Sequence, residues 1–368
     1  MNSALNSQQI DFFVHRDKLQ ASEFTARLLA KADLPDRSLL LKVDRFAFTA
    51  NNITYAILGE QQKYWNFFPA PDGLGSIPVW GFGEVLRSRN PAISEGELIF
   101  GYFPMSTHAV LAPAKVSERG FVEGSAHRQE LPPVYNNYAR VTNDPAFAGR
   151  QGDYQALVRP VYMLSFLVDD HLAENEFFGA RVVLLTSASS KTAIGLAHLL
   201  HLRRQVEVIG LTSAGNKAFV ESLGCYHRVV TYDDLSPLDA KLPAAVVDMA
   251  GNAKLRATIH NLFRDNLKCS CLVGFTHHED LEHNSEPLPG AKPQFFSAPD
   301  QIRKRAKDWG PGGVGKRFSV AWTSVAGLLE HSFKIVHGKG RAAVQAVYRE
   351  TLAGKAKPNE GHILSLWD

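Results

Sequence analysis

The sequence contains few cysteines and no long run of apolar residues. Only Cys225, Cys269 and Cys271 occur among 368 residues, too few for the disulfide framework of a secreted domain, and an odd count suits a reducing compartment. No apolar run approaches the roughly 18 residues needed to cross a bilayer. Residues 1–20 lack the charged and apolar regions of a secretory signal. We therefore predict a cytoplasmic protein with no membrane partner.

The chain also lacks a large excess of positive or negative charge. The chain has 40 Lys+Arg against 37 Asp+Glu, a formal charge of +3, too small to favour nucleic acid as a partner. Apolar residues make up 45% and charged residues 21%, which is typical of a globular protein. A chain of this length is too long for a single ordinary hydrophobic core, so we expect two domains. Because the net charge is weak, we expect a small molecule as the substrate.

Short strands are predicted in the first third of the chain. Residues 38–49 alternate apolar and polar side chains, as a half-buried strand does. Similar runs follow at 77–86, 97–103 and 108–112, separated by glycine and proline. This pattern predicts a small β-barrel.

The middle of the chain alternates strands with helices. Residues 180–186 form a continuous apolar run typical of a buried parallel strand, 191–202 are helical, and 205–211 form a second strand. The alternation continues to a strand at 268–275, which predicts a doubly wound parallel sheet. Further on, residues 318–322 are expected to form a strand.

The first strand-to-helix turn lacks the G-x-G-x-x-G pattern of dinucleotide sites. A helix N-terminus can still bind phosphate through its N–H groups and dipole. Hydroxyl and ammonium donors are available here from Ser187, Ser189, Ser190, Lys191 and Thr192. The alternative is a tight turn capped by a serine.

The end of the second strand lacks an acid. An NAD site usually places Asp or Glu there for the ribose hydroxyls, whereas this chain has Ser213, Asn216 and Lys217. These donors suit a 2′-phosphate and predict NADP rather than NAD. The alternative is an ordinary helix start, capped by Ser213, with Lys217 in solvent.

In this order, the elements of residues 38–368 resemble the medium-chain dehydrogenase/reductase (MDR) superfamily, in its zinc-independent quinone- and enoyl-reductase-like branch. The pattern is similar to that of a poorly characterised subgroup. The matching segments are residues 78–85, 96–101, 180–197, 217–232 and 247–251.

The resemblance implies an α/β protein with a GroES-like β-barrel domain and a Rossmann doubly wound parallel sheet. The implied boundaries are 1–150 for the catalytic domain, 151–300 for the cofactor domain, and 301–368 for a segment that returns to the first domain. It also implies that Tyr232 and Phe275, at two strand ends, lie beside the cofactor, and it suggests a homodimer.

Zinc ligands of the related dehydrogenases are missing. Phe82 stands where the resemblance implies a zinc-binding histidine, and no cysteine precedes Cys225. We therefore predict no metal. Residues 277–283 gather three histidines and three acids, which we interpret as a surface loop.

A zinc-free reductase needs another group to protonate its substrate. In related reductases a tyrosine after the opening strand has this role, and Tyr55 or Tyr64 matches it here; Asn52 lies beside them in sequence. Nearby aromatic residues favour an apolar or aromatic substrate. Each of these aromatic residues could instead belong to the core.

These observations predict an NADP-dependent oxidoreductase that reduces a carbonyl or a conjugated double bond without zinc. Two alternatives stay open. One is a redox-neutral elimination or cleavage enzyme on the same fold. The other is a non-catalytic nucleotide-binding protein, either a sensor or an RNA-binding relative.

Overall fold

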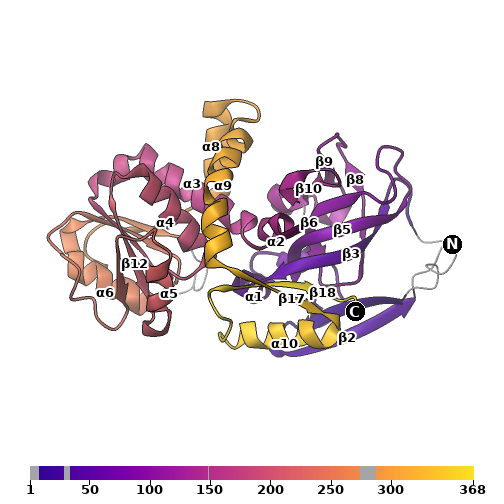
Figure 1. Cartoon of the computed structure of the whole chain (residues 1–368), viewed down its shortest axis with the longest axis horizontal. Coiled ribbons are helices and arrows are strands. Elements are labelled where there is room, and N and C mark those ends of the chain that lie inside the picture. Colours follow the sequence, from indigo (N-terminus) through magenta and orange to yellow (C-terminus); the bar gives the residue numbers. More distant parts are fainter. Residues whose placement is uncertain (1–7, 29–33, 148, 274–286) are drawn as a thin grey trace. The chain divides into compact units, whose positions relative to one another are not determined.

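The structure is a computed structural model that describes residues 8–28, 34–147, 149–273 and 287–368. The chain folds as two units (Figure 1). The first comprises residues 1–157 and 334–368, and the second comprises residues 158–333. No helix in the described ranges has the length and apolar character that a membrane span requires.

Two sheets build the first unit. Alternating apolar residues in β3 (Leu39–Phe48) place Leu39, Leu41 and Val43 in the core. The nine-stranded sheet runs in the order β17 (Lys334–Lys339), β18 (Glu360–Ser365), β3, β5 (Pro78–Ser88), β6 (Leu98–Pro104), β10 (Asn137–Arg140), β9 (Gly120–Glu123) and β8 (Pro113–Ala114), with β7 (His108–Leu111) paired to β3. The strands predicted in this region are confirmed.

A three-stranded sheet in the same unit has no counterpart in the sequence-based prediction. It contains β2 (Lys18–Leu28), β1 (Gln8–His15) and β4 (Leu74–Gly75). Only a short face of β1 is apolar, with Phe12 and Val14 in the core. The helices of this unit are α1 (Ala50–Ile57), α2 (Gly149–Leu157) and α10 (Gly340–Leu352).

Six parallel strands form the sheet of the second unit. Their order is β13 (Arg228–Thr231), β12 (Glu207–Thr212), β11 (Val182–Leu185), β14 (Ala244–Asp248), β15 (Leu267–Leu272) and β16 (Pro293–Phe295). Numbered along the chain this is 3-2-1-4-5-6, the strand order of a dinucleotide-binding sheet. The helix α3 (Arg159–Glu174) precedes the first strand, and α4 (Lys191–Arg203), α5 (Lys217–Ser222) and α6 (Ala253–Phe263) follow β11, β12 and β14. The predicted doubly wound sheet is confirmed.

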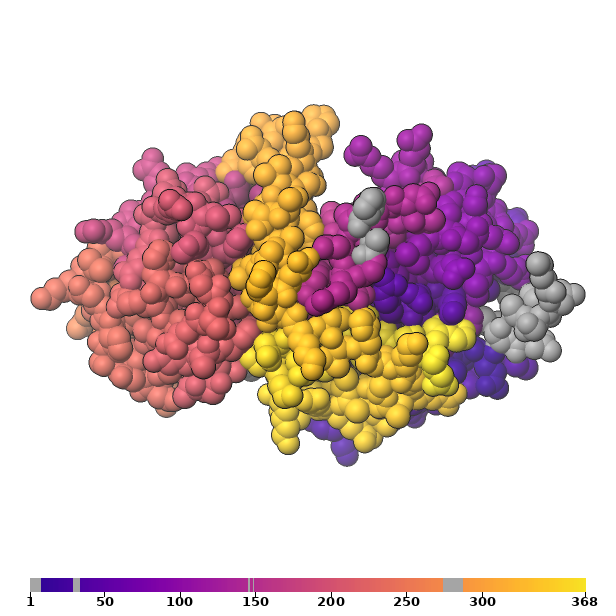
Figure 2. All heavy atoms as spheres, in the orientation of Figure 1, coloured from indigo at the N-terminus to yellow at the C-terminus, as the bar shows by residue number. Residues whose placement is uncertain are grey.

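The predicted boundary at residue 300 and the predicted strand at 318–322 both need correction. Residues 298–333 belong to the second unit, because α8 (Ala298–Trp309) and α9 (Gly313–Ser332) pack against α3. Residues 318–322 lie inside α9, whose buried side chains, Phe318, Val325 and Leu329, recur at helical spacing. The chain returns to the first unit only at β17. Figure 2 shows α9, in orange, at the surface in this view. Among its residues, Val320 is 70% exposed.

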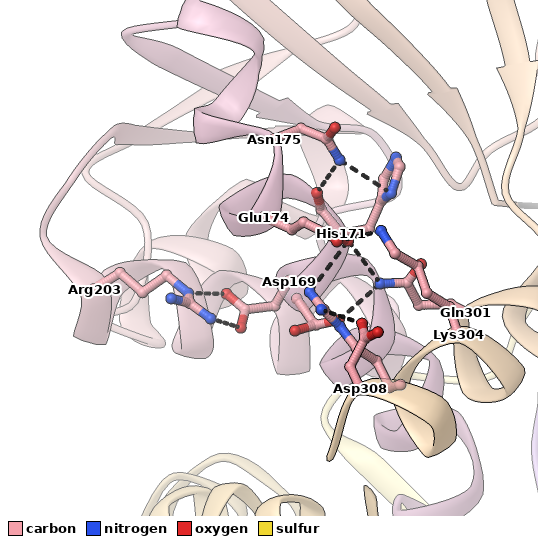
Figure 3. A network of polar contacts seen from close by, with 10 residues as sticks. Asp169, His171, Glu174, Asn175, Arg203, Gln301, Lys304 and Asp308 are labelled. Atoms are coloured by element: carbon pink, nitrogen blue, oxygen red, sulfur yellow. Dashed lines mark hydrogen bonds and ion pairs between the residues drawn. The ribbon is translucent and has the colours of Figure 1, made fainter. Parts of the chain in front are cut away.

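Ion pairs fasten α8 to α3 (Figure 3). Arg305 contacts Asp170 at 2.6 Å and Glu174 at 3.1 Å, and Lys304 also pairs with Glu174. The guanidinium of Arg305 is largely buried in this network. Arg305 therefore joins α8 to α3 within the second unit.

Candidate functional site

The turn between β11 and α4 has a backbone shape that few residues other than glycine adopt. Ser187 has a φ of 49°, in the left-handed region. Its N–H donates to the hydroxyl of Tyr232 at 2.9 Å, and the N–H of Ala188 donates to the carbonyl of Leu211 at 3.0 Å. The predicted residues Ser187 and Tyr232 are thus in contact, and the turn is held against the ends of β12 and β13.

The first turn of α4 offers N–H groups to an anion. Ser190 caps the helix by accepting from the N–H of Ala193 at 3.2 Å. Helix geometry leaves the N–H groups of Lys191 and Thr192 without an intrahelical acceptor. The positive end of the helix dipole lies at the same place. This turn can therefore hold a phosphate without the glycine pattern.

Lys191 adds a positive charge to this helix end. It is half-buried, and burial lowers the pKa of its ammonium to about 8. Its Nζ lies 5.0 Å from the ring centroid of Phe333. A cation at a helix N-terminus opposes the dipole, so an anionic ligand would relieve an unfavourable arrangement.

The turns after β11 and β12 meet through the predicted residues Ser189 and Asn216. The side-chain amide of Asn216 donates to the hydroxyl of Ser189 at 3.0 Å. Ser213 is exposed, and its side chain makes no capping bond. Lys217 lies 3.8 Å from Glu221 in an exposed pair, an arrangement worth about 0.3–0.5 kcal/mol. The ammonium of Lys217 is thus held only weakly.

Two glycines allow close packing around the turn. A Cβ on Gly210 would lie 2.9 Å from the Cβ of Ala188, and one on Gly195 would lie 2.7 Å from the ring of Tyr162. Glycine therefore supports this site by letting β12 approach the turn and α4 approach α3. The sequence pattern at the turn itself did not indicate this.

A buried charged group behind the turn was missed as a site residue. Asp248, at the end of β14, accepts from the hydroxyl of Thr186 at 3.0 Å and from Arg256 at 3.0 Å. It also accepts from the backbone N–H of Gly251. Its position at a strand end, three residues before Gly251, was the available signal. Through these contacts Asp248 holds the turn in place.

An aromatic cluster surrounds the two tyrosines predicted as catalytic. Tyr55 is buried in α1, and Tyr64 is half-buried in η2 (Tyr64–Asn66). Their ring centroids are 4.5 Å apart, and the hydroxyls of Tyr64 and Tyr135 are 3.0 Å apart. Burial raises the pKa of Tyr55 and of Tyr64, and the neighbouring Tyr64 raises that of Tyr55 further. The structure thus brings both predicted tyrosines together with Tyr135 and the buried Tyr102.

Asn52 and Phe82 are buried. The carboxamide oxygen of Asn52 accepts from the N–H of Thr49 at 2.8 Å, and its nitrogen donates to the carbonyl of Pro78 at 2.9 Å. Asn52 therefore fixes the start of α1 against β5. Phe82 is 0% exposed and stacks under the guanidinium of Arg45 at 4.3 Å.

Metal-binding side chains do not gather in the part of the chain that the structure describes. No group of three or more His, Cys, Asp or Glu there could hold an ion. The cluster at 277–283 and the predicted cofactor contact Phe275 lie outside the described residues.

Comparison with known proteins places this geometry in context. The sequence model of the family described as "Protein of unknown function (DUF2855)" matches residues 46–357. No curated protein sequence matches the chain.

Solved structures resemble the whole chain at low sequence identity. CurA from Vibrio vulnificus in complex with NADPH has a TM-score of 0.60 at 10% identity, covering 98% of this chain and 99% of that one. A mutant enoyl thioester reductase from Candida tropicalis has 0.57 at 11%, covering 98% and 100%. S. aureus TarJ in complex with NADPH has 0.54 at 10%, also covering 98% and 100%. These likenesses confirm the predicted fold, a GroES-like barrel domain and a Rossmann domain.

Proposed function

The chain belongs to the DUF2855 family, and we propose that it is an NADPH-dependent, zinc-independent reductase. Its substrate would be a small apolar or aromatic molecule with a carbonyl or a conjugated double bond. The cytoplasmic location and the homodimer stay predictions from the sequence.

One observation carries the proposal. The 3-2-1-4-5-6 sheet has a capped helix at its first turn and an ammonium beside that helix end. Residues 213–217, directly after β12, include no acid. In such sheets the dinucleotide lies at the carboxyl ends of the strands with its pyrophosphate at the first helix. The fold relatives crystallised with NADPH support the same cofactor.

The residues present fit both charged parts of NADPH. The N–H groups of Lys191 and Thr192 and the ammonium of Lys191 would hold the pyrophosphate. Ser213, Asn216 and Lys217 would hold the 2′-phosphate. The ion pair between Lys217 and Glu221 is weak, so Lys217 would leave Glu221 to pair with the phosphate dianion.

The tyrosine cluster would supply the proton. When bound, NADPH supplies a hydride, and the reduced substrate then needs a proton on oxygen or on the α-carbon. Tyr64 is the donor we propose, since it is less buried than Tyr55 and keeps its proton because burial raises its pKa. Tyr135, whose hydroxyl lies 3.0 Å away, would orient it. Asn52 positions α1 and through it Tyr55.

The decisive experiment is a calorimetric titration of the protein with NADPH and with NADH. We expect saturable binding of NADPH and at least about tenfold weaker binding of NADH, a difference of about 1.4 kcal/mol. If neither nucleotide binds, the reductase proposal fails.

If NADPH binds, a panel of enones, quinones and aromatic aldehydes separates the remaining alternatives. Substrate-dependent loss of NADPH absorbance supports reduction. Turnover with constant absorbance would show a redox-neutral elimination or cleavage enzyme, and binding without turnover would favour a nucleotide-binding protein.

A further inference from the structure

A cavity in the second unit lies at the edge of the sheet opposite the proposed cofactor turn. It has a volume of about 570 Å³ and is lined by residues at the amino ends of the strands, among them Val182 of β11 and Glu207 of β12. The four residues of β11 separate the two edges by roughly 13 Å. A ligand here would therefore be distinct from the dinucleotide.

Basic side chains dominate the polar lining of this cavity. Arg181 and Arg204 contribute two guanidinium groups, and no carboxylate among the described residues lies within ion-pair distance of either. By contrast, the adjacent Arg203 makes a bidentate pair with Asp169, with both contacts at 2.7 Å. Among the described residues, the one acid in the lining is Glu207, which is bound by Arg228 at 2.5 Å. The uncompensated charge in the cavity is thus positive.

Two histidines complete the polar wall. The rings of His201 and His227 lie 5.2 Å apart, centroid to centroid. Nδ1 of His227 accepts from the N–H of Val208 at 3.0 Å, so the ring proton of neutral His227 is on Nε2. Nδ1 of His201 is buried and has no hydrogen-bond partner among the described residues. Two imidazoles are too few for a zinc site, which takes three or four protein ligands, so they serve better as hydrogen-bond donors.

Arg204 holds its charge at this place despite an unfavourable backbone conformation. Arg204 follows α4 with a φ of 55°, at a helix end where glycine is the usual residue because it has no Cβ. An arginine in the left-handed region is strained. The half unit of negative charge at the end of α4 is outweighed by the two full charges of the guanidinium groups.

We propose that this cavity binds a small phosphate monoester. A phosphate dianion matches the two guanidinium groups in charge, and its three terminal oxygens accept from several donors, whereas a carboxylate has only two oxygens. Val182, Val206 and Leu242 form an apolar wall for the organic part of the ligand. This inference does not depend on the proposed reductase activity.

Phenyl phosphate is a suitable probe, titrated by calorimetry in a phosphate-free buffer. We expect saturable binding with a Kd of about 1 mM or below. Arg204→Gly should weaken that binding at least tenfold while the unfolding temperature holds or rises, because glycine relieves the left-handed strain. Loss of binding together with equal or greater stability cannot come from misfolding.

Matched variants decide the location. Arg181→Gln should also weaken binding at least tenfold, whereas Arg303→Gln, which removes the same charge from an exposed site on α8, should leave it within twofold. Binding lost in Lys217→Ala and kept in Arg181→Gln would place the probe in the nucleotide site and overturn the proposal. In the unmodified protein, the ring NMR signals of His201 and His227 should shift during the titration. Unchanged ring signals, or no saturable binding, would also overturn it.

Discussion

The backbone N–H of Ser187 donates to the hydroxyl of Tyr232 at 2.9 Å, so the first and third strands of the sheet are joined directly at the proposed phosphate turn. The two residues are 45 positions apart. The bond holds Ser187 in the left-handed region, with a φ of 49°, and thereby sets the direction in which the chain enters α4. Nucleotide binding is therefore expected to depend on a tyrosine that need not touch the phosphates.

Tyr232→Phe tests this dependence. The change removes only the hydroxyl acceptor and leaves the N–H of Ser187 without its partner, at a cost of about 1–3 kcal/mol. We expect the affinities for NADPH and for NADH to fall by a similar factor, about three- to tenfold, because both nucleotides contain the pyrophosphate. Calorimetry measures both constants. Tyr348→Phe, which removes a hydroxyl bonded to Leu19 in the other unit, is the control and should not change either constant.

Lys217→Ala tests the choice of cofactor. Only NADPH carries the 2′-phosphate, so its affinity should fall about tenfold while that of NADH stays within twofold. Glu221→Ala removes the weak partner of Lys217 and should leave NADPH binding unchanged or slightly stronger. Equal losses for the two nucleotides in Lys217→Ala would remove the basis for the NADP assignment.

Lys191 makes the affinity for both nucleotides depend on pH. Its ammonium has a pKa of about 8 because it is buried, so it is charged below pH 8 and neutral above. A bound phosphate favours the charged form, and binding therefore weakens as the pH rises through 8. We expect the Kd to increase about three- to tenfold between pH 7 and pH 9. The Lys191→Gln variant should bind both nucleotides less tightly at pH 7, and its Kd should change little between pH 7 and pH 9. If the variant keeps the pH dependence of the unmodified protein, that dependence comes from another group.

The order of the Rossmann elements could be predicted because each has a strong local signal. The strand at β11 is a continuous apolar run, and α4 begins at a serine cap. Where the local signal was ambiguous, the prediction was wrong. Residues 318–322 combine aromatic and β-branched side chains over five positions, and only the wider spacing of Phe318, Val325 and Leu329 identifies a helix.

Contacts between distant residues could not be predicted from the sequence. Tyr64 and Tyr135 are 71 positions apart, yet their hydroxyls are 3.0 Å apart, and no periodicity carries that information. The cavity that contains Arg181 and Arg204 likewise depends on how strand starts and a helix end converge. The sequence shows which residue types lie at the strand ends. Which side chains contact one another is known only from the folded structure.

Tyr64→Phe tests the proposed proton donor. Removal of a general acid typically lowers kcat by about 10²–10⁴-fold, and binding of NADPH should not change. Tyr135→Phe should have a smaller effect, since Tyr135 only orients the hydroxyl of Tyr64. Because burial raises the pKa of Tyr64, the unmodified enzyme should show no loss of kcat from this group up to about pH 10. If Tyr55→Phe abolishes turnover and Tyr64→Phe does not, the donor is Tyr55.

Gly195→Ala and Gly327→Ala are the same substitution in two helices of one unit, with opposite expected effects. Alanine is favoured over glycine in a helix by about 1 kcal/mol. At Gly327 a Cβ meets nothing within 4 Å, so that gain should appear in full. At Gly195 the Cβ would lie 2.7 Å from the ring of Tyr162 and 2.8 Å from the hydroxyl of Ser165.

Neither neighbour of Gly195 can move away at low cost. The hydroxyl of Tyr162 donates to the carbonyl of Ala321 at 2.9 Å, and that of Ser165 donates to the carbonyl of Thr192 at 2.7 Å. Overpacking of this kind costs about 1–3 kcal/mol and outweighs the gain in helix propensity. We expect Gly195→Ala to lower the unfolding temperature by about 2–6 °C and Gly327→Ala to raise it by about 2–4 °C, as followed by circular dichroism. Since Thr192 belongs to the proposed phosphate turn, Gly195→Ala should also weaken NADPH binding, whereas Gly327→Ala should not. Equal stability of the two variants would show that α3 and α4 are less closely packed than these distances require.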